Sequence, residues 1–398
     1  MMQRLARRTV GAAALLVLLG TSCSHGSNAA RPEPSSTTGS APPGTTLAPV
    51  AVPTVPHGTV SVVPSDVPKN CSVDVTRQLQ AWVDATPDNA TLLFARKGCY
   101  RIDETLHFDQ RHNLLVDGNG ATLRAFARGT RNRAHVLVQT SDNVTIQDLT
   151  VHGANPHAGV SRGSHVAALE AQAGFQISGS SRVMLQGVAA SDVYGDFVYI
   201  GPLDHRPSHN VTVSRSRFAR SGRQGISITS AANVMIADNT ISGAPLSLID
   251  LEANSRSDML QHIAILRNVT GSAHDFWLAD KGANATIGDV EISDNRMMQP
   301  TGGLIFVYGD NPPLRGPFVI DGNQFIASNA VHDEGSKGAF FFANATGVTL
   351  HNNHVTFLDQ MLAVELRGSH HVAVIQNQFD GASYVLLPQD GSTDYHVS

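Results

Sequence analysis

Two acidic residues two positions apart, Asp250 and Glu252, are the strongest candidates for catalysis in this sequence. They lie in residues 248–254, where apolar and polar residues alternate as in a β-strand. Residues i and i+2 of a strand project to the same side, about 6.6 Å apart along the backbone. Two carboxylates at that spacing can differ in pKa and serve as acid and base, and the spacing favours inversion if the reaction is glycoside hydrolysis. The alternative interpretation is a pair of surface acids without a catalytic role.

Further polar residues flank similar short strands before and after this pair, namely Asp196, Arg223, Gln224, Asp280 and Lys281. If the strands stack about 4.8 Å apart, side chains two turns away lie within about 10 Å of one another. We therefore predict one cluster, in which Asp196 and Arg223 join the acidic pair as catalytic residues. Arg223 would bind a uronate carboxylate, act as the base of an elimination, or form a salt bridge to a neighbouring aspartate. The base role needs special surroundings because arginine is normally protonated.

The elements that carry these residues repeat along the chain. Alternating apolar residues, two polar residues and then often Asn with an apolar residue recur at 144–149, 183–188, 211–216, 234–239, 263–268, 290–295, 318–323, 348–353 and 372–377. Successive copies are roughly 23 to 40 residues apart, and a period of this length is typical of a solenoid. Because the apolar residues alternate with period two and the strands end at Asn, Gly or Asp, the solenoid is predicted to be built of β-strands.

An asparagine ends several of these repeats, at Asn239, Asn295, Asn323, Asn353 and Asn377. Asparagine tolerates the left-handed backbone that a sharp corner needs, and its side chain can bond the same residue one turn away. The spacing therefore predicts an internal ladder of asparagines. Each turn alone buries little apolar surface, so the stability of such a coil comes from stacking.

A second strand precedes the first in each repeat, and its outward positions form two columns. The first column is predicted to contain Gln176, Tyr199, Ser227, Asp250, Trp277, Phe306 and Glu365, and the second Ser178, Gly201, Thr229, Glu252, Asp280, Tyr308 and Arg367. Aromatic rings can cover the apolar faces of sugars, and carboxylates or amides can bond sugar hydroxyls. The binding residues are predicted to be Tyr199, Gln224, Trp277, Asp280, Lys281, Tyr308, Glu365 and Arg367. The alternative is a solvated sheet face.

Residues 71–126 resemble the first turns of the pectate-lyase-like superfamily, on the segments 78–83, 98–102 and 116–123, and the later repeats extend the resemblance to about residue 390. The resemblance implies an all-β, right-handed parallel β-helix over residues 70–398, with substrate along one outer strand face. The superfamily includes pectate lyases, polygalacturonases, alginate epimerases and phage tailspikes, so the fold does not fix the chemistry. The catalytic motifs of the first three groups are absent from this chain.

A capping helix and a disulfide are predicted at the N-terminal end of the coil. Residues 74–86 carry an apolar stripe at helical spacing, with Asp74 able to cap its start. Such a helix would cover the open first turn. Cys71 and Cys99 form an even pair in an oxidising compartment once Cys23 is assigned to export, and we predict a disulfide. The alternative is two unrelated buried thiols.

The first 23 residues have the features of an export signal, with a basic start and an apolar run at 10–19. The run is followed by Cys23, as in lipoproteins whose cysteine is lipidated, while the alternative is ordinary cleavage near residues 27–29. Residues 24–69 are rich in Pro, Ser, Thr and Gly and are predicted to be a disordered tether. The folded part would then lie outside the cytoplasm, either anchored to the cell envelope by lipid or secreted.

Composition narrows the class of partner. The net charge is -5 and no basic block is present, which disfavours nucleic acid. The membrane would be contacted only through the lipid anchor, and a monomer is expected. We expect no cofactor, with Ca²⁺ held by Asp250, Glu252 and Asp280 as the alternative. His157 and His165 lie in the insertion 153–172 that could wall the cleft, as general acid or base or as plain loop histidines.

Two functions from different classes follow from these observations. The first is a hydrolase or lyase acting on an acidic or cell-envelope polysaccharide that lies along the outer face. The second is a non-catalytic surface module that binds a glycan or a protein partner on the same face. Variants of the carboxylates and of the aromatic residues on that face would distinguish the two.

Overall fold

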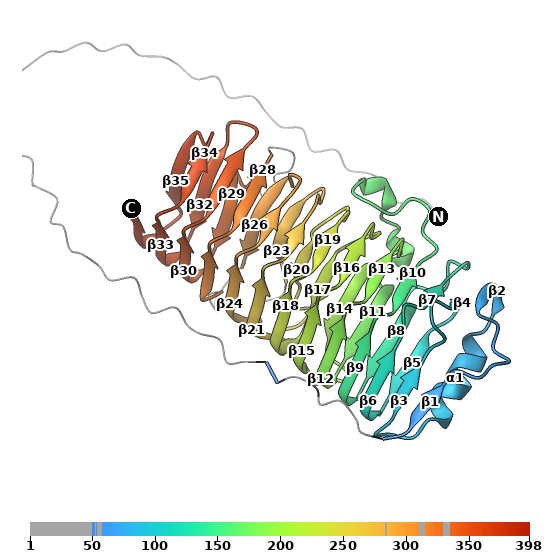
Figure 1. Cartoon of the computed structure of the whole chain (residues 1–398). Helices are drawn as coiled ribbons and strands as arrows, with labels where there is room; N and C mark the ends of the chain where they lie inside the picture. Colours follow the sequence, from blue (N-terminus) through green and yellow to red (C-terminus); the bar gives the residue numbers. More distant parts are fainter. Residues whose placement is uncertain (1–49, 52, 54–57, 283–284, 310–314, 329–334) are drawn as a thin grey trace, which may run out of the picture. The chain divides into compact units, whose positions relative to one another are not determined.

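The computed structural model describes residues 50–51, 53, 58–282, 285–309, 315–328 and 335–398. In this part the chain winds into a right-handed parallel β-helix, in which each full turn contributes a strand to each of three parallel sheets (Figure 1). The sheets have 13, 12 and 11 strands and are called sheets A, B and C here. The predicted fold class is therefore confirmed.

The elements have the following bounds. Sheet A consists of β1 (Val60–Val62), β3 (Thr91–Leu93), β6 (His112–Asp117), β9 (Asp142–Gln147), β12 (Ser181–Gln186), β15 (Ser208–Ser214), β18 (Ala231–Ala237), β21 (Met259–Leu266), β24 (Thr286–Ser293), β27 (Phe318–Asp321), β30 (Thr346–His351), β33 (His370–Ile375) and β36 (Thr393–Val397). Sheet B consists of β2 (Asn70–Asp74), β4 (Cys99–Arg101), β7 (Thr122–Arg124), β10 (Thr150–His152), β13 (Ala189–Ser191), β16 (Arg217–Ala219), β19 (Thr240–Ser242), β22 (Val269–Thr270), β25 (Arg296–Met297), β28 (Gln324–Ala327), β31 (His354–Phe357) and β34 (Gln378–Asp380). Sheet C consists of β5 (Leu106–Asp109), β8 (Ala134–Gln139), β11 (Ala173–Ser178), β14 (Asp196–Gly201), β17 (Ile226–Ile228), β20 (Ile249–Leu251), β23 (Phe276–Asp280), β26 (Gly303–Tyr308), β29 (Gly338–Ala343), β32 (Leu362–Arg367) and β35 (Tyr384–Gln389). The helices are α1 (Thr76–Ala85) and the short 3-10 turns η1 (Arg162–Ser164) and η2 (Ala167–Leu169).

The core fills the inside of the coil. Alternate residues of each strand point inward, as Val234 and Ile236 do in β18 and Ile226 and Ile228 do in β17, and all four are completely buried. Because the strands pair in parallel and in register, residues of like size stack from turn to turn. Side chains that alternate with the inward ones face outward from the three sheets.

The predicted asparagine ladder is present, and Asn268 extends it. The side-chain Nδ2 of each asparagine donates to Oδ1 of the next along Asn239, Asn268, Asn295, Asn323, Asn353 and Asn377, over 3.0, 3.0, 2.9, 2.8 and 2.9 Å. The left-handed backbone lies one residue earlier than predicted. Asp238 (φ 60°) and Asp294 (φ 57°) make the turn. The asparagine that follows turns inward and satisfies buried backbone groups, for example as Asn295 Nδ2 donates to Ile265 O over 2.8 Å.

The folded part begins earlier than the expected boundary at residue 70. Strand β1 pairs in parallel with β3, and Val63 and Val67 are buried in the core. The prediction that residues 24–69 are a disordered tether is therefore wrong for residues 60–69, because their valines supply an additional strand and two core side chains. Residues 24–49 and the predicted lipidation site Cys23 lie outside the described residues, as does the signal segment 1–23.

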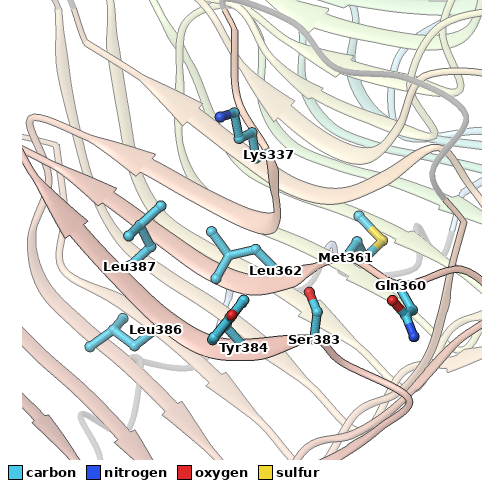
Figure 2. A pocket seen from close by; sticks show the side chains of 8 residues that line it. All are labelled: Lys337, Gln360, Met361, Leu362, Ser383, Tyr384, Leu386 and Leu387. Carbon is cyan, nitrogen blue, oxygen red and sulfur yellow. The ribbon is translucent and has the colours of Figure 1, made fainter. Parts of the chain in front are cut away.

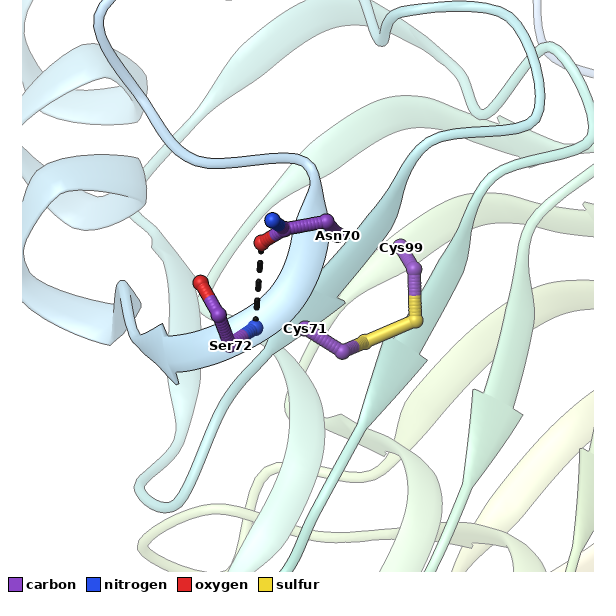
Figure 3. Close-up of a disulfide and its surroundings, with 4 residues drawn as sticks. All are labelled: Asn70, Cys71, Ser72 and Cys99. Carbon is purple, nitrogen blue, oxygen red and sulfur yellow. Dashed lines mark hydrogen bonds between the residues drawn. A yellow bond between two sulfur atoms is a disulfide. The ribbon is translucent and has the colours of Figure 1, made fainter.

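Helix α1 lies at the N-terminal end of the coil (Figure 1), and a disulfide joins two of the first strands. The predicted apolar stripe is buried, with Leu79 and Val83 packed into the core. Asp74 lies just before the helix, where its Oδ1 accepts the backbone N–H of Thr76 over 3.0 Å. Cys71 and Cys99 are joined in the predicted disulfide, which links β2 to β4 (Figure 3). Among the described residues, no helix is both long and apolar enough to cross a membrane.

Candidate active site

The candidate site lies on the outer face of sheet C. One outward column is fixed by the strand register and runs Gln176, Tyr199, Ser227, Asp250, Ala279, Phe306, Phe341 and Glu365. Most of the predicted column is therefore confirmed. Tyr308 and Arg367 also lie where predicted, in the second column. Tyr308 pairs with Ala343 of the next strand, and Ala343 pairs with Arg367 of the strand after it.

The predicted register fails in β23. Asp250 pairs with Ala279, so Trp277 takes the inward position that Leu248 takes one turn earlier. Trp277 is completely buried, and its Nε1 donates to Thr270 Oγ1 over 3.0 Å. Asp280 pairs with Val307 and also faces inward. Trp277 and Asp280 therefore cannot contact a ligand on the outer face, and their prediction as binding residues is wrong.

A cavity of about 500 Å³ opens on this face beside β11, β14, β17 and β20. We call it the acidic cavity, and it is lined by Arg131, Asn132, Glu170, Ala171, Gln172, Gln176, Asp196, Tyr199, Arg223, Thr229, Glu252 and Asn254. Three of the four predicted catalytic residues are in this set, on three successive turns of the coil. The stacking of parallel strands brings them together across 57 positions of sequence, from 196 to 252.

Arg223 connects two of these carboxylates. Its Nη1 lies 3.1 Å from Asp196 Oδ2 and its Nη2 lies 2.6 Å from Glu252 Oε2. Burial alone would lower the pKa of Arg223, but the negative charges of Asp196, Glu252 and Asp250 outweigh it and raise that pKa. Of the three roles predicted for Arg223, the salt bridge is the one that the structure contains. The guanidinium stays protonated and holds both acids in place.

Asp196 is buried at the base of the cavity, with its side chain 3% exposed. It accepts the backbone N–H of Gln224 over 3.0 Å and the hydroxyl of Ser227 over 2.7 Å. Burial raises the pKa of Asp196, while Arg223 and these hydrogen bonds only partly oppose the effect. A carboxyl group with a raised pKa can hold a proton and donate it to a substrate.

Asp250 lies behind the cavity wall. It is 4% exposed and accepts Gln224 Nε2 over 2.8 Å, and it does not line the cavity. Burial, followed by repulsion from Glu252, raises the pKa of Asp250 well above its ordinary value, and a hydrogen bond between the two side chains adds to this. Asp250 and Glu252 therefore lie on the same side of the coil, as predicted, but only Glu252 faces the cavity. Glu252 keeps 32% of its side chain exposed.

Two loops at the corner between sheets B and C complete the wall. Residues Glu170, Ala171 and Gln172 come from the end of the insertion 153–172, which was predicted to wall the cleft. In this insertion, His165 lies 3.3 Å from Glu170, while His157 does not line the cavity. Sequence reasoning missed Arg131 and Asn132 because the segment before β8 has no apolar periodicity from which its position could be read.

The other predicted binding residues have structural contacts. Gln224 is buried and accepts the backbone N–H of Ser247 over 2.6 Å, so it supports the wall from behind. Glu365 is completely buried and accepts the backbone N–H groups of Lys337 and Gly338 over 2.6 and 3.1 Å. A ligand on the outer face cannot reach Gln224 or Glu365 unless these contacts break, so their prediction as direct binding residues is not supported. Tyr199 lines the cavity and accepts the hydroxyl of Thr229 over 2.8 Å.

Beyond the cavity, the same face of sheet C becomes aromatic. Phe306 stacks between Phe276 and Phe341, with ring centroids 4.9 and 4.8 Å away, and all three are buried. Lys281 lies over the rings of Phe276 and Phe306, and Arg367 lies over Phe341. We call this group the aromatic cluster, and Tyr308 packs against it.

The predicted Ca²⁺ alternative required Asp280 to converge with Asp250 and Glu252. Asp280 instead faces inward and forms a completely buried ion pair with Arg315 over 3.1 Å. Within the described residues, no three side chains of the His, Cys, Asp or Glu type are grouped so as to hold a metal ion.

A second cavity, of about 460 Å³, lies near the C-terminal end of sheet C. Its lining residues are Lys337, Gln360, Met361, Leu362, Ser383, Tyr384, Leu386 and Leu387 (Figure 2). It contains no carboxylate.

Sequence comparison gives two results. The family model described as "Right handed beta helix region" matches residues 102–261 and 173–355, which together cover more than half of the chain. The uncharacterized protein YclG of Bacillus subtilis is 26% identical over 224 residues, a match that covers 48% of this chain and 38% of YclG. The chain thus spans less than half of that relative's length.

Solved structures share the fold over most of the chain. A polygalacturonase from Erwinia carotovora superposes with a TM-score of 0.62 at 15% identity, covering 89% of this chain and 99% of its own. PfbA, a surface adhesin of Streptococcus pneumoniae, superposes with a TM-score of 0.61 at 15% identity, covering 85% and 91%. One of these proteins is an enzyme by its name and the other an adhesin, and at such identities the likeness concerns the fold.

Proposed function

The chain belongs to the right-handed β-helix family, and from that premise we propose that it binds a polysaccharide along the outer face of sheet C and hydrolyses it in the acidic cavity. The observation that carries the proposal is a pair of carboxylates, Asp196 and Glu252, that line one cavity. Each of them pairs with a different terminal nitrogen of the Arg223 guanidinium. Most glycoside hydrolases use two carboxyl groups that flank the scissile bond and have separate roles.

The environments of the two acids favour one assignment of roles. Asp196 is buried and its pKa is raised, so it would donate a proton to the glycosidic oxygen. Glu252 is more exposed and would take a proton from the water that attacks the anomeric carbon. Arg223 and Asp250 would act as positioning residues, since Arg223 holds both acids and Asp250 contacts Glu252 from behind.

Hydrolysis is favoured over elimination by the state of Arg223. An elimination needs a base that removes a proton next to a uronate carboxylate, and a positive group that neutralises that carboxylate. Arg223 is committed to Asp196 and Glu252 over 3.1 and 2.6 Å, and its pKa is raised by their charges. It is therefore poorly suited to either role.

The location of the protein follows from the same proposal. A polysaccharide of the cell envelope or its surroundings is reached only from outside the cytoplasm, which agrees with the basic and apolar start of the chain and with the Cys71–Cys99 disulfide. We propose a monomer exported by the N-terminal segment, with Cys23 as a lipid anchor or with release after cleavage. We propose neither a nucleic-acid partner nor a cofactor.

The test is a glycan screen with the mature chain. Neutral, uronate-rich and amino-sugar polysaccharides are incubated with the protein, and new reducing ends and ultraviolet-absorbing unsaturated products are measured separately. We expect new reducing ends without unsaturated products, and loss of turnover in Asp196→Asn and Glu252→Gln. Glu291→Gln, the same change on sheet A far from the cavity, serves as the control. Turnover that survives in both cavity variants would contradict the proposal.

A non-catalytic binding module is the second candidate, favoured by one observation. Asp196 and Glu252 both form ion pairs with Arg223, so their oxygens are engaged within the cavity wall. In this case no glycan is cleaved, and binding persists in Glu252→Gln but weakens in Tyr199→Ala, because the ring and not the charge would contact the sugar. The binding and turnover measurements on the same variants separate the two functions.

A further inference from the structure

We propose that the acidic cavity selects a glycan whose sugars carry protonated amines, such as an unacetylated hexosamine polymer, and rejects one that carries carboxylates. This inference rests on the proposed function and names its substrate class. It departs from the acidic polysaccharide expected from sequence. The argument depends on which charges line the cavity and on what already neutralises them.

The lining of the acidic cavity has more negative than positive groups. Its charged residues are Arg131, Glu170, Asp196, Arg223 and Glu252, which are two cations and three carboxylates. Asp250, whose raised pKa favours its protonated form, lies directly behind Glu252 and shares a hydrogen bond with it. The excess of one carboxylate in the lining disfavours an anion that enters and favours a cation, and both effects are stronger here than in bulk water because the site is partly buried.

Both cations are already paired with acids of the same wall. The two terminal nitrogens of Arg223 donate hydrogen bonds to Asp196 and Glu252. Arg131 lies 3.1 Å from Glu170. A uronate carboxylate could reach either guanidinium only by displacing one of these carboxylates and by leaving it unpaired, which is costly for the buried Asp196. The uncharged polar lining, which includes Gln176, can bond sugar hydroxyls whatever the charge of the polymer.

An ammonium group would find a prepared site. Glu252 is more exposed than Asp196, the other proposed catalytic carboxylate, and it lines the cavity. An amine bonded there would add a second positive charge beside Glu252, whose Oε2 lies 2.6 Å from Arg223 Nη2. Lys281, a cation of the next turn, does not line the cavity and lies over the rings of Phe276 and Phe306.

The test compares oligosaccharides that are matched in length and differ in charge. Glucosamine, N-acetylglucosamine and galacturonate oligomers of equal length are titrated into the mature chain by calorimetry, in mildly acidic buffer of low ionic strength. We expect the glucosamine oligomer to bind at least about tenfold more tightly than its acetylated counterpart, and the galacturonate oligomer to bind most weakly. Added salt should reduce the first affinity and leave the second unchanged.

Two variants show whether the cavity is responsible. Glu252→Gln should shrink the preference for the amine about tenfold and leave binding of the acetylated oligomer within a factor of about two. Glu291→Gln, which removes the same charge from sheet A, should leave the preference unchanged. An equal loss in both variants would mean that overall charge attracts the amine, and it would overturn the proposal.

Other outcomes are equally decisive. Tightest binding of the galacturonate oligomer, or equal binding of the two glucosamine oligomers, overturns the amine preference and leaves hydrolysis in place if new reducing ends are formed. If no oligomer binds and none of the polysaccharides in the screen is cleaved, the proposed function itself fails and this inference fails with it.

Discussion

The outer face of sheet C has two halves that share one register and differ in what covers them. In the half formed by β11 to β20, the outward column passes through Tyr199 and Asp250, and polar groups surround the acidic cavity. In the half formed by β23 to β32, the same column passes through Phe306 and Phe341, whose rings stack and are buried. The change occurs between Asp250 and Ala279, which are neighbours in adjacent strands.

The difference teaches that an outward position in a β-helix is not always a solvated one. Buried rings in contact contribute packing energy, whichever face of a sheet they lie on. Polar groups that line a cavity contribute little to stability unless their hydrogen bonds are satisfied, but they are available to a ligand. The aromatic half should therefore govern stability and the acidic half function, and four measurements test this division.

The largest effect is expected in the acidic half. Glu252→Gln should lower turnover of the substrate by about 100- to 10,000-fold, the range typical of a lost acid–base group. The free energy of unfolding should change by less than about 1 kcal/mol, because the side chain is partly exposed and Arg223 keeps its contact with Asp196. Turnover and chemical denaturation are measured on one preparation. A loss of stability that accounts for the lost activity would break the comparison.

The reverse result is expected for the aromatic cluster. Phe306→Ala should lower the free energy of unfolding by about 3–5 kcal/mol, since the ring is completely buried and packs against Phe276 and Phe341. Glycan binding should stay unchanged at temperatures where the variant is folded. Denaturation gives the first quantity and calorimetry the second. If Phe306→Ala weakens binding as much as it weakens stability, the two halves form one site.

Asp280, at the junction between the two halves, should make the stability of the protein depend on pH. Burial, only partly opposed by Arg315, raises the pKa of Asp280 from 3.8 to about 7. The folded state therefore holds this proton more tightly than the unfolded chain. The resulting stabilisation is fully present below pH 3.8, is lost as the pH rises to about 7, and amounts to on the order of 4 kcal/mol. Midpoints of urea denaturation across this range should show the slope.

The matched variant for this test is Asp280→Asn, which should flatten the dependence because the group can no longer titrate. Asp109→Asn, at an exposed position of β5, should keep the slope of the natural protein. A slope that persists unchanged in Asp280→Asn would show that another group is responsible.

The smallest effect is expected for the cation above the aromatic cluster. Lys281 lies 5.3 and 5.1 Å from the ring centres of Phe276 and Phe306. Lys281→Met keeps a side chain of similar length and removes its charge. It should lower the free energy of unfolding by about 0.5–1 kcal/mol. Because Lys281 does not line the acidic cavity, the amine preference should not depend on it. A larger loss of stability would mean that its other contacts matter more than the rings.

Much of the fold could be predicted from sequence because its signals repeat. The period-two alternation located the strands, and Asn239 to Asn377 located the ladder. The cluster of Asp196, Arg223 and Glu252 could be predicted from these signals. Residues at the same position of successive repeats lie side by side on successive turns when the strands stack in register.

The rest could not be predicted, for physical reasons. All five residues of β23 are buried, so the period of two that identifies the outward side is missing there, and the position of Trp277 was misassigned. The burial of Asp250 and Glu365 depends on groups from other turns, namely the side chain of Gln224 and the backbone N–H groups of Lys337 and Gly338. The alternation gives the direction of a side chain but not its depth.

The ladder also limits where the chain can change. From β9 onward, the corner between sheets A and B has two residues in every turn, such as 148–149, 238–239 and 376–377. The corner between sheets B and C ranges from residues 153–172 in one turn to 381–383 in the last. The first corner keeps a constant length while the second accepts insertions, so part of the wall of the acidic cavity can be exchanged without displacing Asp196 or Glu252. Grafting a different segment at 153–172 is thus a route by which evolution or an engineer could retarget the molecule.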